Sequence, residues 1–136
     1  MGTGAQLATS PWIFGGESAS TAVPATITLV DGTTFMVSDR AGDVDRDAAQ
    51  GLFMLDTRVL SIWRLLVGGR PVQSLSVIPN GPFSAAFVGR REVEGVVDAP
   101  IVIVQRRALG GGMREDVEIR NHAMDPIDVD VTLHVD

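Results

Sequence analysis

The chain has no cysteine, no lysine and no tyrosine among its 136 residues. Without cysteine, disulfide bonds and thiolate metal sites are both excluded, and the composition suits a cytoplasmic protein. Basic residues are also scarce, because 17 acidic residues outnumber 11 arginines and give a net charge of −6. Surfaces that bind nucleic acids or anionic membranes need clustered positive charge. We therefore expect neither nucleic acid nor a membrane among the partners of this protein.

We expect neither a targeting segment nor a membrane-spanning segment in these residues. No apolar run approaches the length of a transmembrane helix, and no basic residue precedes Arg40, so the charged region of a signal peptide is missing. Residues 1–25 are rich in Gly, Ala, Ser and Thr, and such a segment buries too little apolar surface to order itself. We predict a flexible N-terminal segment over residues 1–25 and a single domain over residues 26–136.

What the sequence does contain is a succession of short β-rich runs separated by Gly, Pro, Asn and Asp. Asp31-Gly32 between two such runs is typical of a hairpin turn. Residues 127–135 alternate strictly between apolar and polar side chains, which indicates a strand with one face on a core and the other in water. No stretch has a convincing helical period. The fold prediction is an all-β antiparallel sandwich of roughly eight or nine strands.

Asp43, Asp45 and Asp47 have the spacing that opens a calcium-binding loop. The rest of that loop does not follow, because Ala48 stands where it requires glycine and Met54 where it requires a bidentate glutamate. A looser calcium or magnesium site stays open as an alternative, but a solvated loop is favoured. We assign no metal ligand.

Residues for nucleophilic catalysis or cofactor binding are equally sparse. The two histidines, His122 and His134, lie at a predicted strand end and on the polar face of a predicted strand, and the sequence has no Gly-x-Ser-x-Gly elbow. The triple glycine at residues 110–112 is not followed by Lys-Ser or Lys-Thr, so it does not form a phosphate-binding loop. We assign no catalytic residue and no cofactor.

The charged stretch that follows the first hairpin is the main candidate site. Two carboxylates that flank a glycosidic bond can hydrolyse it, and Asp39, Asp43 and Asp56 have the right chemistry, but the sequence does not place them in space. The favoured alternative is structural. In it, Asp39 or Asp56 forms ion pairs with Arg40 or Arg58 across neighbouring strand ends.

The sequence LVDGTTFMVSDRAGDV, followed by GLFMLDTRVLSIWRLLVGGRPVQSLS, closely resembles the N-terminal domain of bacterial glycogen debranching enzymes of the amylo-α-1,6-glucosidase type. The later segment EDVEIRNHAMDPIDVDVTLHVD resembles a pair of strands in the same domain. The resemblance covers about residues 26–136, and its most specific segment is Asp-Thr-Arg. The matching residues are Phe35, Ser38, Asp39, Gly42, Asp43, Gly51, Leu52, Phe53, Asp56, Thr57, Arg58, Leu60 and Ser61.

The resemblance implies a cytoplasmic, non-catalytic accessory domain that packs on a catalytic (α/α) barrel and helps to shape its glucan cleft. In the family, that barrel lies further along the chain and carries the catalytic acids, so the glycoside hydrolase activity is expected of the parent protein, of which this chain would be a fragment. The resemblance also implies a structural or cleft-lining signature of six residues, namely Asp39, Arg40, Asp43, Asp56, Thr57 and Arg58.

Two other functions stay open. A stand-alone carbohydrate-binding module would hold α-glucan on exposed aromatic residues such as Trp12, Trp63 or Phe83. A self-associating interaction domain is the second. Residues 59–67 are predicted to form one strand with apolar side chains on both faces, and the second face needs a cover. In the parent enzyme the cover would be the barrel or a later strand of the same domain. In this chain we expect that surface to be exposed and to drive formation of a two-fold homodimer.

Overall fold

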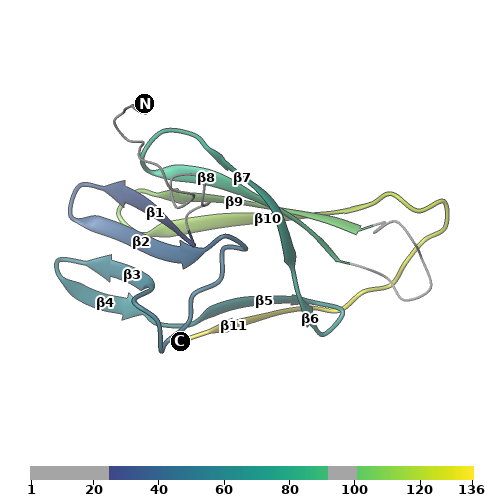
Figure 1. The fold of residues 1–136 in the computed structure, drawn as a ribbon, viewed down its shortest axis with the longest axis horizontal. Coiled ribbons are helices and arrows are strands. Elements are labelled where there is room, and N and C mark those ends of the chain that lie inside the picture. The colour runs from purple at the N-terminus through teal and green to yellow at the C-terminus, as the bar shows by residue number, and fades with distance from the viewer. Residues whose placement is uncertain (1–24, 92–100) are drawn as a thin grey trace, which may run out of the picture.

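The computed structural model describes residues 25–91 and 101–136, and the regular elements in these residues are all β-strands (Figure 1). They form three antiparallel sheets. The first has the order β1 (Thr26–Asp31), β2 (Thr34–Asp39), β3 (Gly51–Met54), β4 (Thr57–Leu60). The second has the order β10 (Met113–Asn121), β9 (Ile101–Leu109), β8 (Ser84–Arg91), β7 (Gln73–Pro79). The third has the order β11 (Val131–Val135), β5 (Trp63–Val67), β6 (Arg70–Pro71). The predicted all-β antiparallel sandwich is confirmed, although the described residues hold eleven strands rather than eight or nine.

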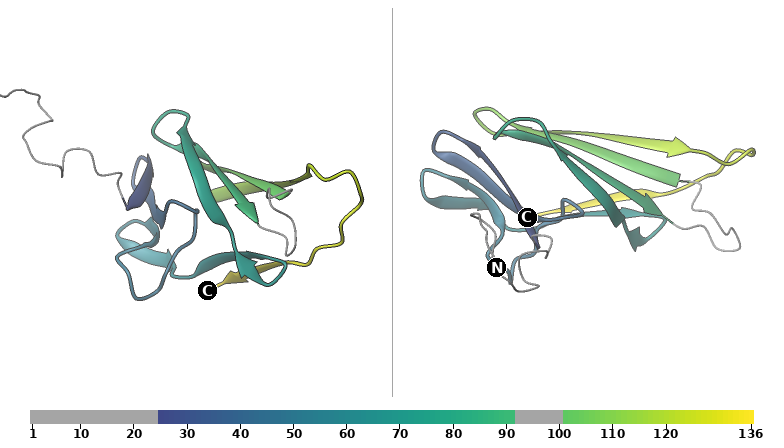
Figure 2. Two further views of the ribbon diagram at one scale, coloured as in Figure 1. Left: turned by 45° about the vertical axis from the view of Figure 1, so that its right-hand side comes forward. Right: turned by 45° about the horizontal axis from the view of Figure 1, so that its top comes forward.

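The long sheet of β7 to β10 forms one layer, and the two smaller sheets face different parts of it (Figure 1, Figure 2). One core joins Leu29 and Met36 of the first sheet to Phe87 of β8. A second core joins Leu65 of β5 to Ile103 of β9. Inner faces that interdigitate in this way are typical of sandwiches. We call the half of the sandwich that contains β1 to β4 the closed half. The half that contains β5, β6 and β11 is the open half.

Hairpin turns account for much of the first sheet. β1 and β2 are joined by the two-residue turn Gly32–Thr33, one residue further on than predicted. β3 and β4 are joined by Leu55 and Asp56, which both have positive φ angles (50° and 64°). Two consecutive residues with positive φ are typical of a type I′ turn. The sequence does not reveal this turn because neither residue is glycine.

The single strand predicted over residues 59–67 is wrong. β4 ends at Leu60 and β5 begins at Trp63, and the two strands belong to different sheets. Between them, the backbone N–H groups of Ser61 and Ile62 donate to the Asp136 carbonyl at 2.6 and 3.0 Å. A continuous apolar run cannot show where a chain changes sheets, because the strands on either side are both apolar.

The apolar surface expected on the second face of β5 is also small. Leu65 and Val67 point to the core and are buried, whereas Arg64 and Leu66 point outward, and only Leu66 is apolar. The larger exposed apolar surface lies on the neighbouring strand β11. Its three apolar side chains keep much of their surface in contact with water: Val131 (49 %), Leu133 (43 %) and Val135 (54 %). The prediction that residues 127–135 bury one face is therefore wrong for β11.

One prediction falls on residues that the structure does not describe. The N-terminal segment predicted to be flexible covers residues 1–25, with Trp12, and residues 1–24 lie outside the described ranges. Within the described ranges, no helix is long and apolar enough to cross a membrane.

Candidate functional site

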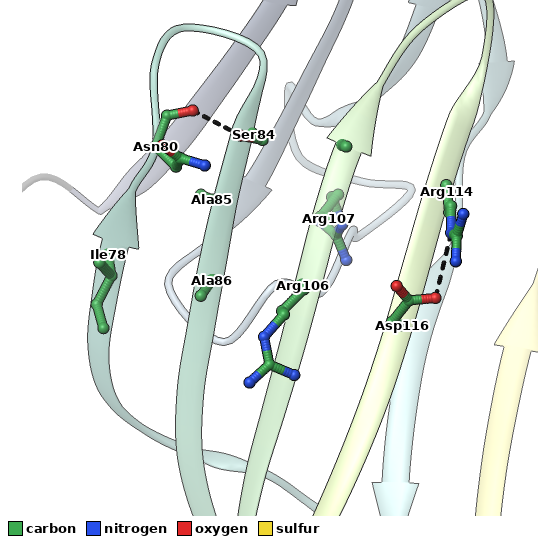
Figure 3. A pocket seen from close by; sticks show the side chains of 10 residues that line it. Ile78, Asn80, Ser84, Ala85, Ala86, Arg106, Arg107, Arg114 and Asp116 are labelled. Atoms are coloured by element: carbon green, nitrogen blue, oxygen red, sulfur yellow. Dashed lines mark hydrogen bonds and ion pairs between the residues drawn. The ribbon is translucent and has the colours of Figure 1, made fainter.

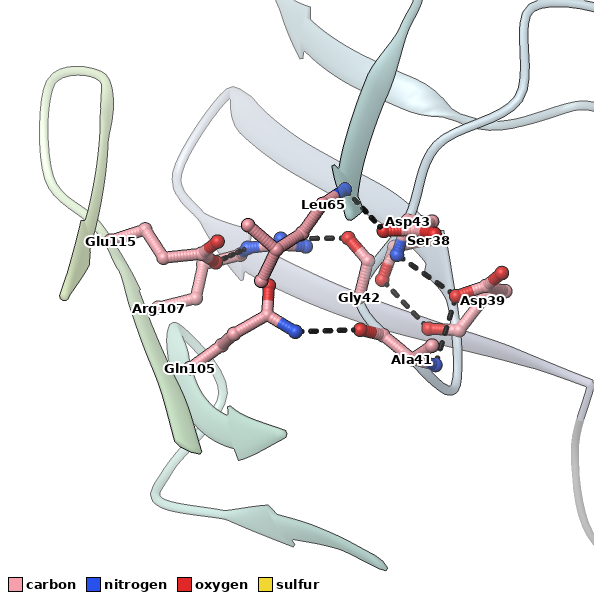
Figure 4. A network of polar contacts seen from close by, with 9 residues as sticks. All are labelled: Ser38, Asp39, Ala41, Gly42, Asp43, Leu65, Gln105, Arg107 and Glu115. Atoms are coloured by element: carbon pink, nitrogen blue, oxygen red, sulfur yellow. Dashed lines mark hydrogen bonds and ion pairs between the residues drawn. The ribbon is translucent and has the colours of Figure 1, made fainter. Parts of the chain in front are cut away.

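The residues from Asp39 to Asp43 form a tight turn after β2, the Asp39–Asp43 turn (Figure 4). Asp39 Oδ1 accepts hydrogen bonds from the backbone N–H groups of Ala41 and Asp43, both at 2.9 Å. The backbone N–H of Asp39 donates to the Asp43 carbonyl, also at 2.9 Å. Aspartate side chains commonly stabilise turns by bonding to nearby backbone groups. Asp39 thus holds the turn together from inside and is not a free carboxylate.

Gly42 brings this turn close to the long sheet. Its φ angle is 88°, a value that favours glycine. A Cβ atom at this position would lie 3.3 Å from Nη2 of Arg107 and 3.4 Å from Cγ of Phe87. The neighbouring Arg40 contributes through its backbone, because its carbonyl accepts a hydrogen bond from Ser74 Oγ at 3.0 Å. The turn is therefore fastened to β8 and β9 on one side and to β7 on the other.

Arg107 of β9 is the centre of the contacts between the turn and the long sheet (Figure 4). Its Nε donates to Glu115 Oε1 at 2.5 Å, and both side chains are buried, with 0 % and 2 % of their surface exposed. Its Nη2 donates to the Gly42 carbonyl at 2.7 Å. The guanidinium also lies 4.9 Å from the ring centroid of Phe87 and 5.6 Å from that of Trp63. A planar fork of donors over aromatic faces suits arginine and not lysine.

Gln105, two residues before Arg107, adds a second link. Its Nε2 donates to the Ala41 carbonyl at 2.9 Å. In the described residues, four other buried polar atoms have no protein partner, and they belong to Trp63, Gln105, Arg107 and Glu115. Buried polar atoms of this kind are usually met by ordered water. We call Gln105, Arg107 and Glu115, with Trp63 and Phe87, the Arg107 cluster.

Sequence reasoning missed the Arg107 cluster, although one signal points to it. In β9, residues 101, 103, 105, 107 and 109 lie on one face, and all five are buried. Because side chains alternate along a strand, the isoleucines at 101 and 103 and the leucine at 109 place Gln105 and Arg107 on the core face. The ion-pair partner Glu115 cannot be found this way, because it lies on another strand.

Asp43 has an unusual charge environment. Burial raises the pKa of the Asp43 carboxyl from 3.8 to about 6, and the nearby Asp39 carboxylate adds to this. The backbone N–H of Leu65, which donates to Asp43 Oδ1 at 3.2 Å, lowers the pKa, as do Arg64 and Arg107. A pKa near 6 is compatible with acid–base chemistry. However, the neighbouring Asp39 is occupied by two backbone N–H groups, so the two carboxylates do not form a free pair.

Asp56, Thr57 and Arg58 lie in the β3–β4 hairpin and are exposed. The predicted ion pairs with Asp39 or Arg40 are not formed. Asp56 sits in the type I′ turn, and Arg58 Nη1 donates to the backbone carbonyls of Gln50 and Arg46 at 3.1 and 3.3 Å. The physical reason is that the turn removes Asp56 from the strand, so Asp56 and Arg58 do not share a strand face.

Gly51 lies where β3 and β4 approach each other closely. A Cβ atom on Gly51 would lie 2.6 Å from the carbonyl oxygen of Leu60 and 2.7 Å from Cδ of Arg58. Only glycine permits such a close approach of two strands. The segment from Gly51 to Leu60 therefore encodes a hairpin.

The family model of the N-terminal domain of (some) glycogen debranching enzymes matches residues 29–136. The chain belongs to this family. The matched range contains the Asp39–Asp43 turn, the β3–β4 hairpin and the Arg107 cluster. No curated protein and no solved structure matches the chain.

In this debranching-enzyme domain the six signature residues split into two groups. Asp39, Arg40 and Asp43 belong to the turn that contacts the Arg107 cluster. The Asp39 carboxylate accepts from backbone N–H groups, whereas Arg40 accepts from the Ser74 hydroxyl through its backbone carbonyl. Asp56, Thr57 and Arg58 belong to the hairpin some distance along the chain. The two groups are not joined by an ion pair in the described part of the chain.

Asp45 and Asp47, which were candidates for a metal site, lie in the loop between β2 and β3. The backbone N–H of Asp47 donates to Asp45 Oδ1, and that of Asp45 to Gln50 Oε1, so this loop is held by its own hydrogen bonds. Across residues 25–91 and 101–136, no three His, Asp or Glu side chains gather into a possible metal site.

Trp63 is half-buried against the core of the closed half, whereas Phe83 is exposed in the β7–β8 loop.

Proposed function

We propose that this domain is a non-catalytic accessory part of a glycogen debranching enzyme. It packs on the catalytic part of that enzyme and helps to shape the glucan cleft. The observation that carries the proposal is the apolar row on β11, formed by Val131, Leu133 and Val135. Membership of the debranching-enzyme family supports the parentage.

The β11 row lies on the inner side of its sheet. In the antiparallel pairing, Val131 is directly opposite Val67 and Leu133 is directly opposite Leu65. Residues directly opposite each other point to the same face. Val67 and Leu65 are 0 % and 2 % exposed, so the same face is covered over β5 and uncovered over β11.

The free edge of β11 supports the same conclusion. β11 pairs only with β5 in the described part of the chain, and its register with β5 runs without a bulge. It contains neither proline nor lysine between Val131 and Val135. Natural edge strands usually carry such protection against pairing with other chains. An unprotected edge beside an uncovered apolar row suits a surface that is covered in the assembled enzyme.

The non-catalytic assignment rests on the carboxylates. Asp39 is bonded to backbone N–H groups, Asp56 lies in an exposed turn, and Asp43 is half-buried against Leu65. Glycoside hydrolysis needs two carboxyl groups on either side of the scissile bond, and these three do not provide such a pair. The purified chain should release no glucose from a limit dextrin. Release that is abolished by Asp43→Asn would contradict the assignment.

For the chain on its own, we propose a two-fold homodimer through the β11 row. The alternation of apolar and polar residues in β11, Val-Thr-Leu-His-Val, is symmetric about Leu133. Antiparallel pairing of two copies would place Leu133 opposite Leu133 and Val131 opposite Val135, so that the apolar side chains of the two rows contact one another across the new strand pair. Closed two-fold symmetry is the commonest arrangement of homo-oligomers.

Sedimentation velocity at several micromolar concentrations tests the homodimer. Leu133→Asn should shift the chain to monomer, whereas Thr132→Asn, on the opposite face of the same strand, should leave association unchanged. A wild-type chain that stays monomeric throughout would contradict self-association.

A further inference from the structure

The outer face of the long sheet carries a depression of about 550 Å³ (Figure 3). Its position follows from the strand register. Ser84 of β8 lies opposite Ala108 of β9, which in turn lies opposite Arg114 of β10. A second row runs parallel to the first and consists of Ile78, Ala86, Arg106 and Asp116. The depression therefore crosses all four strands, a span of about 14 Å at the usual spacing between strands.

Small side chains form the floor of the depression. Ser84, Ala86 and Ala108 occupy neighbouring positions on the outer face of β8 and β9. Longer side chains surround them, with Ile78 at one end and Arg114 at the other (Figure 3). Both of these are exposed, and Arg114 has 81 % of its side-chain surface open to solvent. The hollow is thus produced by a local deficit of side-chain volume on the solvent face of the sheet.

The charges around the depression cancel one another. Arg114 Nε lies 3.3 Å from Asp116 Oδ1, and Arg106 Nη1 lies 2.9 Å from Glu118 Oε1. A bound anion would have to compete with these carboxylates for each arginine. An uncharged ligand would not, so the electrostatics favour a neutral ligand.

The hydrogen-bonding groups that remain around the depression include both donors and acceptors. Each guanidinium has five N–H donors and uses few of them in its ion pair, and each carboxylate keeps further lone pairs. The Asn80 side chain adds an amide, and Ser84 Oγ donates to the Asn80 carbonyl at 2.6 Å. A hydroxyl group is both donor and acceptor. A ligand rich in hydroxyls therefore fits donors and acceptors that lie side by side.

We propose that this depression binds a short stretch of a neutral polysaccharide chain, with α-glucan as its ligand. The hydroxyls would bond to Arg106, Arg114 and Asp116, and the apolar faces of the sugar rings would contact Ile78 and Ala86. The neutral, hydroxyl-rich class follows from the site, and the choice of α-glucan rests on the proposed function. The site lies on the face of the sheet opposite the core, so a glucan chain here and a partner on the inner-facing β11 row do not compete.

Affinity electrophoresis in gels with and without glycogen tests the proposal, together with calorimetric titration of the chain with a linear maltooligosaccharide. Ala108→Gln fills the floor, and Arg114→Ala removes an exposed donor. Each should abolish the retardation by glycogen and weaken maltooligosaccharide binding by about tenfold or more. The matched controls are the exposed Ala49→Gln and Arg70→Ala, which lie outside the depression and should bind as the wild type does.

Three outcomes would overturn the proposal. The first is a wild-type chain that glycogen does not retard, and the second is retardation that survives both Ala108→Gln and Arg114→Ala. The third is displacement of the sugar by inorganic phosphate, because it would show an anion site. Leu133→Asn separates this proposal from the proposed function, since it should disrupt packing through β11 and leave glucan binding intact.

Discussion

The closed and open halves of the domain distribute their polar and apolar residues in opposite ways. In the closed half an arginine, a glutamate and a glutamine are buried between the layers. In the open half three valine and leucine side chains of β11 are exposed on the inner side of the sheet. Burial therefore follows the presence of an opposing layer and not the polarity of the residue. We infer that the open half packs against another surface through β11.

The largest expected effect comes from breaking the Arg107–Glu115 pair. Arg107→Met should destabilise the domain by about 3–5 kcal/mol, because it leaves the Glu115 carboxylate buried without its partner. Arg106→Met, next to it but on the outer face, is the control and should change the free energy of unfolding little. Chemical denaturation measures both. If Arg107→Met and Arg106→Met were equally mild, the buried pair would not be the support of the closed half.

A double variant sharpens this test. Arg107→Met with Glu115→Leu replaces both charges by apolar groups of similar size, and such replacements of buried pairs are often neutral. We expect the double variant to be more stable than Arg107→Met alone. An additive loss of stability would show that the contact of Arg107 with Gly42 matters more than its charge balance.

Truncation of two leucines that lie opposite each other compares the covered strand β5 with the uncovered strand β11 inside the open half. Leu65→Ala should cost about 2–5 kcal/mol, because it leaves a cavity in a packed core. Leu133→Ala, directly opposite on β11, should cost about 1 kcal/mol or less, because its side chain already contacts water. Thermal or urea unfolding of the two variants measures the difference. Equal losses would mean that β11 is as well covered as β5.

Asp43 should make the difference in stability between wild type and Asp43→Asn depend on pH. Its pKa is raised from 3.8 to about 6 by burial, so the folded state holds the proton more tightly than the unfolded state. The stability from this group is present in full below about pH 4 and is lost as the pH rises through 6. Asp43→Asn keeps an oxygen for the Leu65 N–H and has no charge, so it should be more stable than the wild type above pH 6, by about 1–2 kcal/mol after allowance for partial exposure.

Urea unfolding at pH 4 and pH 7.5 measures this effect. The two proteins should converge at pH 4 and separate at pH 7.5. The exposed Asp47→Asn is the control for the loss of one negative charge. A constant difference between Asp43→Asn and wild type at both pH values would contradict the role of burial.

The smallest effect is expected in the β3–β4 turn. Asp56 has a φ of 64° and its side chain is exposed. Asp56→Ala should cost about 1 kcal/mol, because alanine tolerates this backbone conformation less well. Asp56→Gly should be close to neutral, because glycine adopts it freely. The shift of each variant's melting temperature from that of the wild type measures the effect, and a large loss with both variants would point to a contact of the carboxylate itself.

The sequence predicts the local features of this fold well. The all-β class, the hairpin near Asp31-Gly32 and the strand character of the final segment follow from alternation and turn residues, which depend on near neighbours. The family resemblance follows from the turn and hairpin segments. These signals are contained within a few residues each.

The sequence does not predict features that depend on residues far apart in the chain. Alternation along β9 places Arg107 on the core face, but no pattern near Arg107 identifies its partners, Glu115 and the turn at Gly42. The change of sheet between Leu60 and Trp63 depends on pairing with β11. The role of Asp56 depends on a turn without glycine. In each case a contact between distant segments decides the outcome, and local propensity does not contain that information.

Amide hydrogen exchange of residues 131–135 tests the central claim most directly. It would be compared between the chain alone, at concentrations where it is monomeric, and a full-length debranching enzyme that carries this domain. We predict that the β11 amides on the free edge exchange rapidly in the isolated chain and become protected in the full-length enzyme, while the Arg107 cluster is protected in both. Equal exchange of β11 in the two proteins would contradict the claim that this edge packs against the rest of the enzyme.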